Sequence, residues 1–445
     1  MRQKTPDNRA EFTCRRVLFG RFLATVIACL TLILSVACSP GEKDVQTGVA
    51  QYGESGAEFA RRLAAECPRR LPYSDQESRA ADLIMEELKR YGYAPEKQLF
   101  SVTDEEGVRR TSANIIAKQQ GNGFALSPKL EESVKATLPD QRHGLMMILG
   151  AHYDTPAVEQ VPDEDDELET LQANGIHDNA SGVASVLTAA RVMREMPPGY
   201  DVTFVFFGAG TDSFEGARHY LSTLSVDVRK QVEVMVNIGP VFAGDKVYAH
   251  AGQNSVRSDD QKDYAKRRKL YQVTDIFFEN QLNSRNRYAI YTNQASFLVP
   301  GPHGGSAIFR EWTTKTSDHT PFDDAGIPIV FMESGDYRVR TEGEVGIESR
   351  NPFFHATGGI ISGTPFDQTD VLEDLFRKMD EQAARQTIPV IDPTGTQAEE
   401  EEPPEEEEYE KDMTPIARLP QRINNTAFVI VQLARKGPLN YDYNG

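Results

Sequence analysis

The sequence predicts an α/β domain in which helices cover both faces of a central sheet. Five short stretches are almost continuously apolar, as strands are when both faces of their sheet are buried. Segments with helical periodicity alternate with these stretches along the chain. The length of 445 residues is compatible with two or three domains, or with one large α/β domain carrying appendages.

The elements can be placed in chain order. Ser74 followed by Glu77 is a capping-box pattern, and it precedes apolar residues at helical spacing that end at Gly92. Strands are predicted at 114–117, 145–150, 202–208, 232–238 and 327–332, and further helices at 183–196 and 371–384. In sheets of this kind the reactive residues gather in the loops that follow the strands.

Composition excludes two classes of protein. The formal charge of −19 argues against a nucleic-acid-binding protein, so no nucleic-acid partner is expected. Four cysteines, at positions 14, 29, 38 and 67, form neither a disulfide framework nor a paired metal motif. We therefore expect any metal site to use histidine and carboxylate ligands.

The first 37 residues are predicted to be a signal peptide. Three arginines precede an uncharged run from Phe22 to Ala37, which is short for a membrane span of about 20 residues. The small residues before Cys38 resemble a bacterial lipoprotein box, so Cys38 is the expected lipid anchor. Residues 38–52 would then be a tether, and the protein would lie in the bacterial cell envelope, on the periplasmic side of the inner or outer membrane. The alternative is an uncleaved anchor helix.

The remaining boundaries follow from composition. Residues 53–388 form the predicted domain, and 389–413 form a linker that we expect to be disordered, because ten acidic residues fall between positions 399 and 412. Residues 414–445 form a C-terminal segment whose apolar part, 427–433, is too short to span a bilayer. It either docks on the domain or stays free.

Three loops after predicted strands carry potential metal ligands. His152 and Asp154 lie two residues apart at a strand end, where a carboxylate can hold a metal-binding imidazole in orientation. Asp178 lies in a turn that leads into a helix, and His319 lies in a loop just before a strand. Ligands on three such loops predict a metal site more strongly than any one of them does.

With these motifs in place, the chain resembles the di-zinc aminopeptidase family, which includes glutamate carboxypeptidase-like and glutaminyl cyclase-like proteins. The resemblance extends from about Ala57 to about Ala384. It implies a single three-layer α/β/α domain around a mixed, mainly parallel sheet, and zinc as the cofactor. By the same resemblance, His152 binds one zinc, His319 binds a second, and Asp178 bridges both. Asp154, the carboxylate beside His152, is the expected catalytic residue.

The chain departs from the family at three positions. Where the family usually has two consecutive glutamates, a general base and a zinc ligand, this chain has Gly210 and Thr211. Gly239 occupies the position of a ligand aspartate. Replacements remain conceivable: Asp212, Asp245 and His177 are near in sequence, although a solvent-facing loop is the expected location for His177.

Two hypotheses follow. In the first, the domain is catalytically degenerate, binds zinc with reduced occupancy, and uses its cleft for a peptide, a small molecule or a partner. In the second, it is an active metallo-aminopeptidase with a rearranged or single-zinc site. The first is favoured, because a lost ligand weakens zinc binding by about 100-fold and a lost general base costs about 10²–10⁴ in rate. Glutaminyl cyclase-like chemistry is less favoured than either hypothesis, because it needs the ligand that Thr211 replaces.

Overall fold

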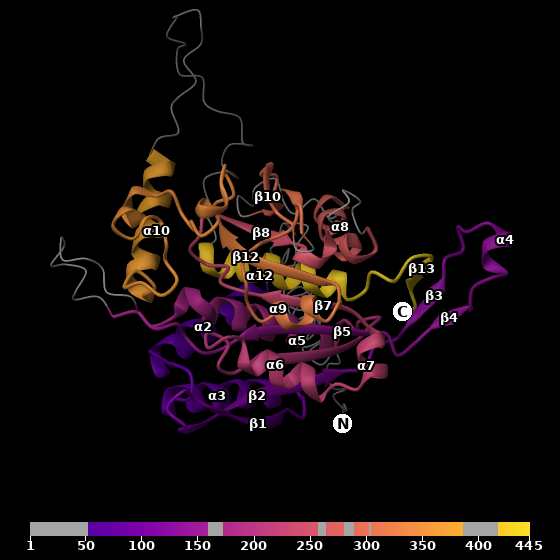
Figure 1. Ribbon diagram of the computed structural model, residues 1–445, viewed down its shortest axis with the longest axis horizontal. Helices are drawn as coiled ribbons and strands as arrows, with labels where there is room; N and C mark the ends of the chain where they lie inside the picture. The colour runs from indigo at the N-terminus through magenta and orange to yellow at the C-terminus, as the bar shows by residue number, and fades with distance from the viewer. Residues whose placement is uncertain (1–51, 159–171, 257–263, 280–288, 302–303, 386–416) are drawn as a thin grey trace, which may run out of the picture. The chain divides into compact units, whose positions relative to one another are not determined.

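The computed structural model describes residues 52–158, 172–256, 264–279, 289–301, 304–385 and 417–445 (Figure 1). The predicted signal peptide, Cys38, the tether up to residue 51 and the acidic linker lie outside the described residues. Within the described part of the chain, no helix is long and apolar enough to cross a membrane.

The central sheet has eight strands in the order β1-β2-β6-β5-β7-β12-β8-β9. Its four middle strands are parallel: β6 (Asp201–Phe207), β5 (Met146–His152), β7 (Val232–Ile238) and β12 (Ile329–Gly335). The flanking strands make the sheet mixed, because β1 (Glu96–Thr103), β2 (Arg109–Gln119) and β8 (Lys246–His250) join it in antiparallel pairings, and β9 (Ile290–Thr292) runs parallel to β8. The expected sheet type is confirmed.

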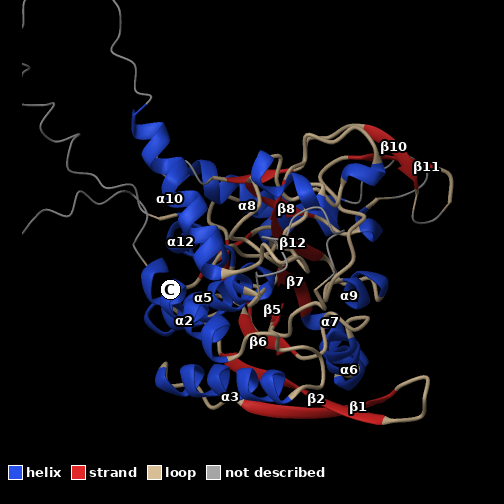
Figure 2. Cartoon of the chain, turned by 90° about the vertical axis from the view of Figure 1, so that its left-hand side faces the viewer, coloured by secondary structure: helices blue, strands red, loops and turns tan. Residues whose placement is uncertain are grey.

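Helices lie on both sides of this sheet, as Figure 2 shows. One side carries α2 (Gly53–Glu66), α3 (Asp75–Arg90), α5 (Ser181–Glu195) and α12 (Arg418–Leu433). The other side carries α6 (Glu215–Thr223), α7 (Val226–Gln231) and α9 (Thr320–Asp324). The remaining helices are α4 (Glu132–Lys135), α8 (Tyr264–Glu279) and α10 (Thr369–Arg385). This is the three-layer α/β/α arrangement that the sequence predicted.

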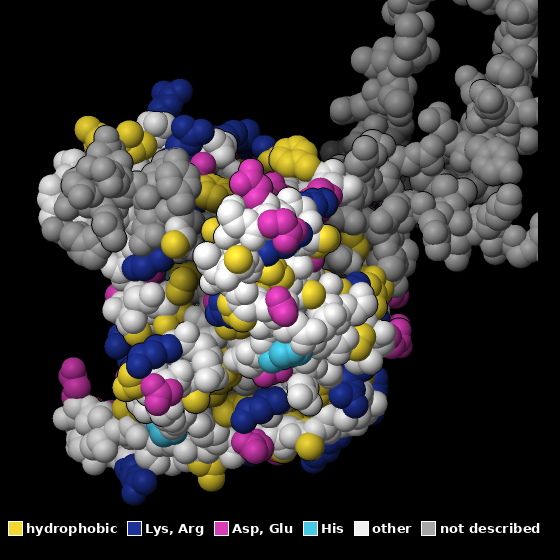
Figure 3. Space-filling view, turned by 90° about the vertical axis from the view of Figure 1, so that its right-hand side faces the viewer, with side chains coloured by type: hydrophobic (Ala, Val, Ile, Leu, Met, Phe, Trp, Pro, Cys, Tyr) yellow, Lys and Arg dark blue, Asp and Glu magenta, His cyan; other side chains and the backbone are white. Residues whose placement is uncertain are grey.

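Two small sheets complete the described elements. β10 (Phe297–Pro300) pairs with β11 (Ser306–Phe309), and β3 (Phe124–Leu126) lies between β4 (Gln141–Arg142) and β13 (Tyr441–Tyr443). The second sheet therefore ties the C-terminal end of the chain to the segment that precedes β5. On the face shown in Figure 3, basic and acidic side chains are interspersed among scattered hydrophobic ones.

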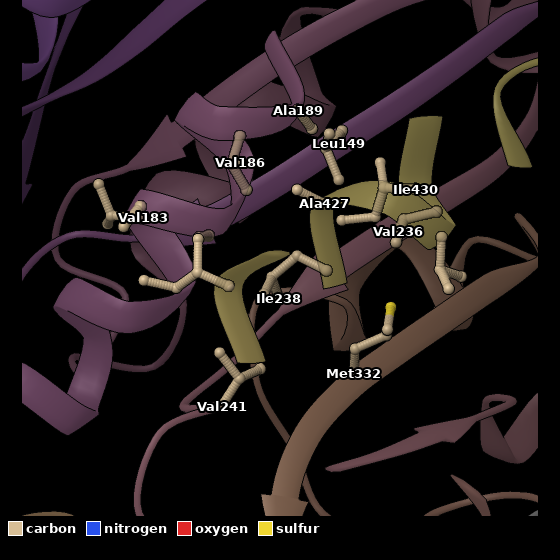
Figure 4. Close-up of a cluster of buried hydrophobic side chains, with 14 of the residues drawn as sticks. Leu149, Val183, Val186, Ala189, Val236, Ile238, Val241, Met332, Ala427 and Ile430 are labelled. Atoms are coloured by element: carbon tan, nitrogen blue, oxygen red, sulfur yellow. The ribbon is translucent and has the colours of Figure 1, made fainter. Parts of the chain in front are cut away.

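The core has one part on each face of the sheet. The larger part joins α2, α5 and α12 to inward side chains of β5, β7 and β12. Figure 4 shows the contribution of α5, α12 and these strands. The smaller part lies under α6 and α9 and contains Ile148, Phe207 and Phe322. Alternate residues of each middle strand supply the two parts, which explains why these strands are apolar throughout.

The C-terminal helix α12 is part of the domain core. Almost all of its residues are buried, and it packs against α2 and α5. The guanidinium of Arg422, itself 1% exposed, donates hydrogen bonds to the carbonyls of Phe242, Gly244 and Asp245 at 2.6–2.9 Å. Of the two possibilities left open by the sequence, the structure shows the docked one, and the helix begins nine residues before the predicted apolar stretch.

Candidate metal-binding site at the ends of the parallel strands

The adjacent parallel strands β5, β7 and β12 end side by side. Side chains at these ends project to the face of the sheet that carries the smaller part of the core. In the register of the sheet, Gly150 of β5 and Phe331 of β12 both pair with Asn237 of β7. Two residues further along, His152, Gly239 and Glu333 therefore form a row across adjacent strands, with their Cβ positions on one face. This row holds one predicted zinc ligand and the position of a missing one.

His152 is held between two carboxylates. Its Nδ1 lies 3.4 Å from Asp154 Oδ1, and its Nε2 lies 3.2 Å from Asp178 Oδ1. Burial disfavours a charged ring, but the two carboxylates outweigh burial and raise the pKa of His152 well above its usual value. Nδ1 facing Asp154 and Nε2 facing Asp178 is the orientation that a metal-binding histidine requires.

The turn that carries Asp178 is anchored by a second aspartate. Asp367 accepts hydrogen bonds from the backbone N–H groups of His177 and Asp178 at 2.7 and 3.0 Å. Burial raises the pKa of Asp367 to about 6. Asn179 donates to the carbonyl of Ile238 at 2.9 Å, which ties the turn to the end of β7. Sequence reasoning missed Asp367, because it lies almost 190 residues from the turn that it supports.

The loop after β6 folds onto Asp154. The Asp154 carboxylate accepts hydrogen bonds from the backbone N–H groups of Gly210 and Thr211 at 2.9 and 2.8 Å, and from the Thr211 hydroxyl at 2.6 Å. Glu77 supports the same loop from the other side by accepting from the N–H of Ala209 at 2.7 Å. Thr211, which occupies the position of a zinc ligand in the family, is thus turned toward Asp154.

The space around Gly210 leaves no room for a side chain. A Cβ atom there would lie 2.3 Å from the Cβ of His152 and 3.0 Å from Oδ1 of Asp318. Contacts shorter than 3.0 Å require the backbone or the neighbour to move. The family's general base therefore cannot be accommodated at Gly210 in this arrangement.

Gly239 and His319 share one aromatic neighbour. A Cβ atom at Gly239 would lie 3.0 Å from the ring of Phe331, and the same ring packs against His319 in a tilted arrangement with a centroid distance of 4.5 Å. His319 is 3% exposed, and burial lowers its pKa to about 3, partly offset by a hydrogen bond to the backbone of Lys315. The neutral form of the His319 ring is thus favoured, and the ring is packed against an aromatic side chain.

The carboxylate of Asp318 has no hydrogen-bond partner. Its side chain is fully buried, and neither oxygen atom is bonded. Burial raises its pKa to about 7, and the nearby Asp154 and Asp178 act in the same direction against His152. Asp318 precedes His319 directly, but a sequence pattern does not distinguish a buried carboxylate from a solvated one. Sequence reasoning therefore missed it.

Two of the three conceivable replacement donors, Asp212 and Asp245, form hydrogen bonds with other residues. Asp212 is exposed and accepts a hydrogen bond from the Tyr73 hydroxyl at 2.7 Å. Asp245 accepts from the Ser349 hydroxyl at 2.6 Å and from the backbone N–H of Arg350 at 3.1 Å. Neither carboxylate is directed to a missing ligand position.

The expected solvent-facing location of His177 is wrong. The residue is fully buried, and its Nε2 lies 3.2 Å from Glu348 Oε1. Its Nδ1 accepts a hydrogen bond from the backbone N–H of Ala243 at 3.1 Å. The turn runs inward under Asp367, so both ring nitrogens have structural partners and His177 is no spare ligand.

A cavity of about 270 Å³ lies next to this site. It is lined by residues that flank the Asp154 and Asp178 loops, including Thr155, Gly175, Asp367 and the exposed Arg69. The Thr155 hydroxyl is buried and has no hydrogen-bond partner. A small polar group could therefore bind in this cavity beside the histidine–aspartate pair.

The donor set does not fit two zinc ions. Within the described ranges, no group of three or more His, Cys, Asp or Glu side chains could hold a metal ion. The structure brings together His152, Asp154 and Asp178, while His319 lies against Phe331. The donors that a metal could still recruit are the two oxygen atoms of Asp318, which have no hydrogen-bond partner, and Asp178 Oδ1, which lies 3.2 Å from His152 Nε2.

The fold and the histidine–aspartate pair define a zinc-exopeptidase-like domain. Residues 133–379 match the model of peptidase family M28, and the chain belongs to this family.

Individual relatives agree with this assignment. The alkaline phosphatase isozyme conversion protein of Escherichia coli is 22% identical over 305 residues, which cover 67% of this chain and 76% of the relative. An aminopeptidase of Bacillus subtilis is 26% identical over 44% of this chain, but the alignment spans only 33% of that protein. A crystal structure of a zinc aminopeptidase from Bacillus subtilis is 13% identical with a TM-score of 0.51, covers 89% of this chain and 98% of its own, and supports the fold alone.

Proposed function

We propose that this protein is a catalytically degenerate member of its family, exported as a lipoprotein, whose former active-site cleft binds a peptide, a small molecule or a partner protein. The proposal includes zinc binding with reduced occupancy. It rests on the residues of the site, since the family relationship by itself favours an active peptidase.

The loop after β6 is the observation that carries the proposal. Thr211, at the position of a zinc ligand, donates its hydroxyl hydrogen to Asp154, and Gly210, at the position of the general base, has no space for a side chain. Because the base and a ligand are lost from one loop, and the exposed Asp212 in that loop does not replace them, both metal binding and water activation are weakened.

A turnover assay tests the proposal. The purified protein is dialysed against zinc and incubated with aminoacyl anilides, in parallel with its His152→Ala variant. We expect the same background hydrolysis for both proteins. Turnover by the parent protein that disappears in the variant would overturn the proposal, because His152 has no role in hydrolysis if the site is inactive.

A second candidate function is peptide hydrolysis with a single zinc. The unbonded carboxylate of Asp318 favours it, since a buried carboxylate without a partner costs free energy that a metal ion would recover. His152, Asp178 and Asp318 would then be the ligands, after a movement of their side chains. In the same assay, an Asp318→Asn variant that loses the turnover of the parent protein would support this candidate.

The location in the cell envelope is a separate part of the proposal. Cys38, which lies outside the described residues, would carry the lipid and attach the domain to a membrane. Metabolic labelling with a fatty acid, followed by membrane fractionation, tests this assignment with the Cys38→Ser variant. We expect acylation and membrane association of the parent protein, and neither in the variant. An unlabelled parent protein would contradict the assignment.

A further inference from the structure

Glu333, the third member of the row at the strand ends, is paired with a lysine from the loop that carries His319. Its Oε2 accepts a hydrogen bond from Lys315 Nζ at 2.8 Å. The other oxygen, Oε1, accepts from the Tyr337 hydroxyl and lies 3.5 Å from His250 Nε2. The Glu333 side chain is 5% exposed, so this is a largely buried ion pair.

The pair lies next to a missing ligand. A Cβ atom at Gly239 would lie 3.6 Å from the Cβ of Glu333, and both residues belong to the row that begins at His152. An aspartate at position 239 would project onto the same face, where it would meet the Glu333 carboxylate. In this chain position 239 has no side chain, and the Glu333 carboxylate is paired with the Lys315 ammonium group instead.

Other carboxylates of the site also favour the charged form of Lys315. Burial disfavours its charged form, but Glu333, Glu348 and Asp178 outweigh burial and raise its pKa. The pKa of Glu348 is lowered. Burial alone would raise it, but the positive charges of His177 and Lys315 outweigh burial and lower it to about 2. The site therefore contains buried carboxylates whose charge is balanced by an internal cation.

We propose that the ammonium group of Lys315 replaces a metal ion of the family's site as the counter-charge for Glu333. The inference rests on the proposed degenerate function, and it explains why the site can stay folded without a full set of metal ions. It also gives a reason for the loss of the ligand at Gly239. Because Lys315 already neutralises the neighbouring Glu333, an additional carboxylate is not needed to hold a cation, and a second zinc ion would meet a positive charge.

Zinc binding by lysine variants tests this inference. The parent protein and the Lys315→Met, Lys315→Arg and Lys378→Met variants are prepared in EDTA, exchanged into metal-free buffer, and titrated with zinc chloride alone. Lys378 is the matched control, because it forms a 2.7 Å pair with Asp374 on the exposed surface of α10. Melting temperature and zinc content per chain are measured for each protein.

We expect Lys315→Met to melt at a lower temperature than the parent protein in EDTA, and to regain about 5–10 °C with zinc. It should also bind one more zinc ion per chain than the parent protein. Lys315→Arg and Lys378→Met should behave like the parent protein. The inference is overturned if Lys315→Met gains neither zinc nor thermal stability on titration.

A double variant covers the case in which Lys315→Met does not fold. Lys315→Met combined with Glu333→Gln removes both charges, and we expect it to fold and to melt at a higher temperature than Lys315→Met. A double variant that is no more stable than the single one would overturn the inference. The proposed function is contradicted by a different result, zinc-dependent turnover by the parent protein. Even in that case, the gain of one zinc ion in Lys315→Met can still be measured.

Discussion

The Thr211 hydroxyl donates a hydrogen bond to the Asp154 carboxylate across 2.6 Å, so the residue at the position of a zinc ligand instead supports the aspartate that orients His152. Removing this hydroxyl in Thr211→Val should cost about 1–3 kcal/mol of unfolding free energy, because Asp154 is fully buried. Urea denaturation measures the loss. Thr211→Ser keeps the hydroxyl and should retain most of the stability; an equal loss in both variants would contradict the hydrogen-bond explanation.

The second prediction concerns the crowding at Gly210. Gly210→Ala should destabilise the protein by about 1–3 kcal/mol, because its Cβ would overlap that of His152. Gly346→Ala is the control, since no atom lies within 4 Å of a Cβ at that exposed position, and its effect should stay within about 0.5 kcal/mol. Thermal unfolding compares the two variants. A Gly210→Ala protein as stable as the control would mean that the loop can make room for a side chain.

The third prediction uses the raised pKa of Asp318. Burial raises this pKa to about 7, whereas an aspartate in the unfolded chain has a pKa of about 3.9. Between these values the folded protein binds the additional proton, so this group lowers stability progressively as the pH rises from about 4 to 7. The Asp318→Asn variant lacks the group and should gain stability relative to the parent protein over that interval, by on the order of 3 kcal/mol.

Urea denaturation at pH 5 and pH 8 in EDTA measures this difference. Asp227→Asn serves as the control, because Asp227 is 89% exposed, and it should show no comparable change between the two pH values. A parent protein whose stability relative to Asp318→Asn is the same at both pH values would show that Asp318 ionises as an ordinary aspartate.

The fourth prediction concerns the C-terminal helix. Arg422→Met removes the donors to four carbonyl groups in the segment that follows β7, and should cost about 3 kcal/mol or more. Arg377→Met removes an exposed arginine of α10 and should cost no more than about 1 kcal/mol. If both variants unfold at the same urea concentration, α12 contributes little to the stability of the domain.

The middle of the fold was predictable from sequence because its signals are local. Continuous apolar runs placed β5, β6, β7 and β12, and the capping pattern placed α3, where Ser74 accepts a hydrogen bond from the backbone N–H of Glu77 at 3.1 Å. The edge strands β1 and β9 were missed, and so was β8 beside β9. β1 and β9 carry exposed residues, and β8 begins with the exposed Lys246 and ends with His250, so none of the three has a long continuous apolar pattern.

The candidate site was predictable only in part. The positions of His152, Asp154 and Asp178 followed from the strand-end pattern, and the structure brings these three side chains together. The supporting residues Glu77, Asp367 and Lys315 come from distant parts of the chain, and their contacts depend on tertiary packing. The inward direction of His177 depends in the same way on Glu348, which lies 171 residues further along the chain.

The zinc content of the parent protein tests the central claim most directly. After dialysis against zinc and removal of unbound metal, inductively coupled plasma mass spectrometry gives the number of zinc ions per chain. We predict less than one zinc ion per chain, with no difference greater than the measurement error between the parent protein and its Gly239→Ala variant. Two zinc ions per chain, lost together in His152→Ala, would contradict the account.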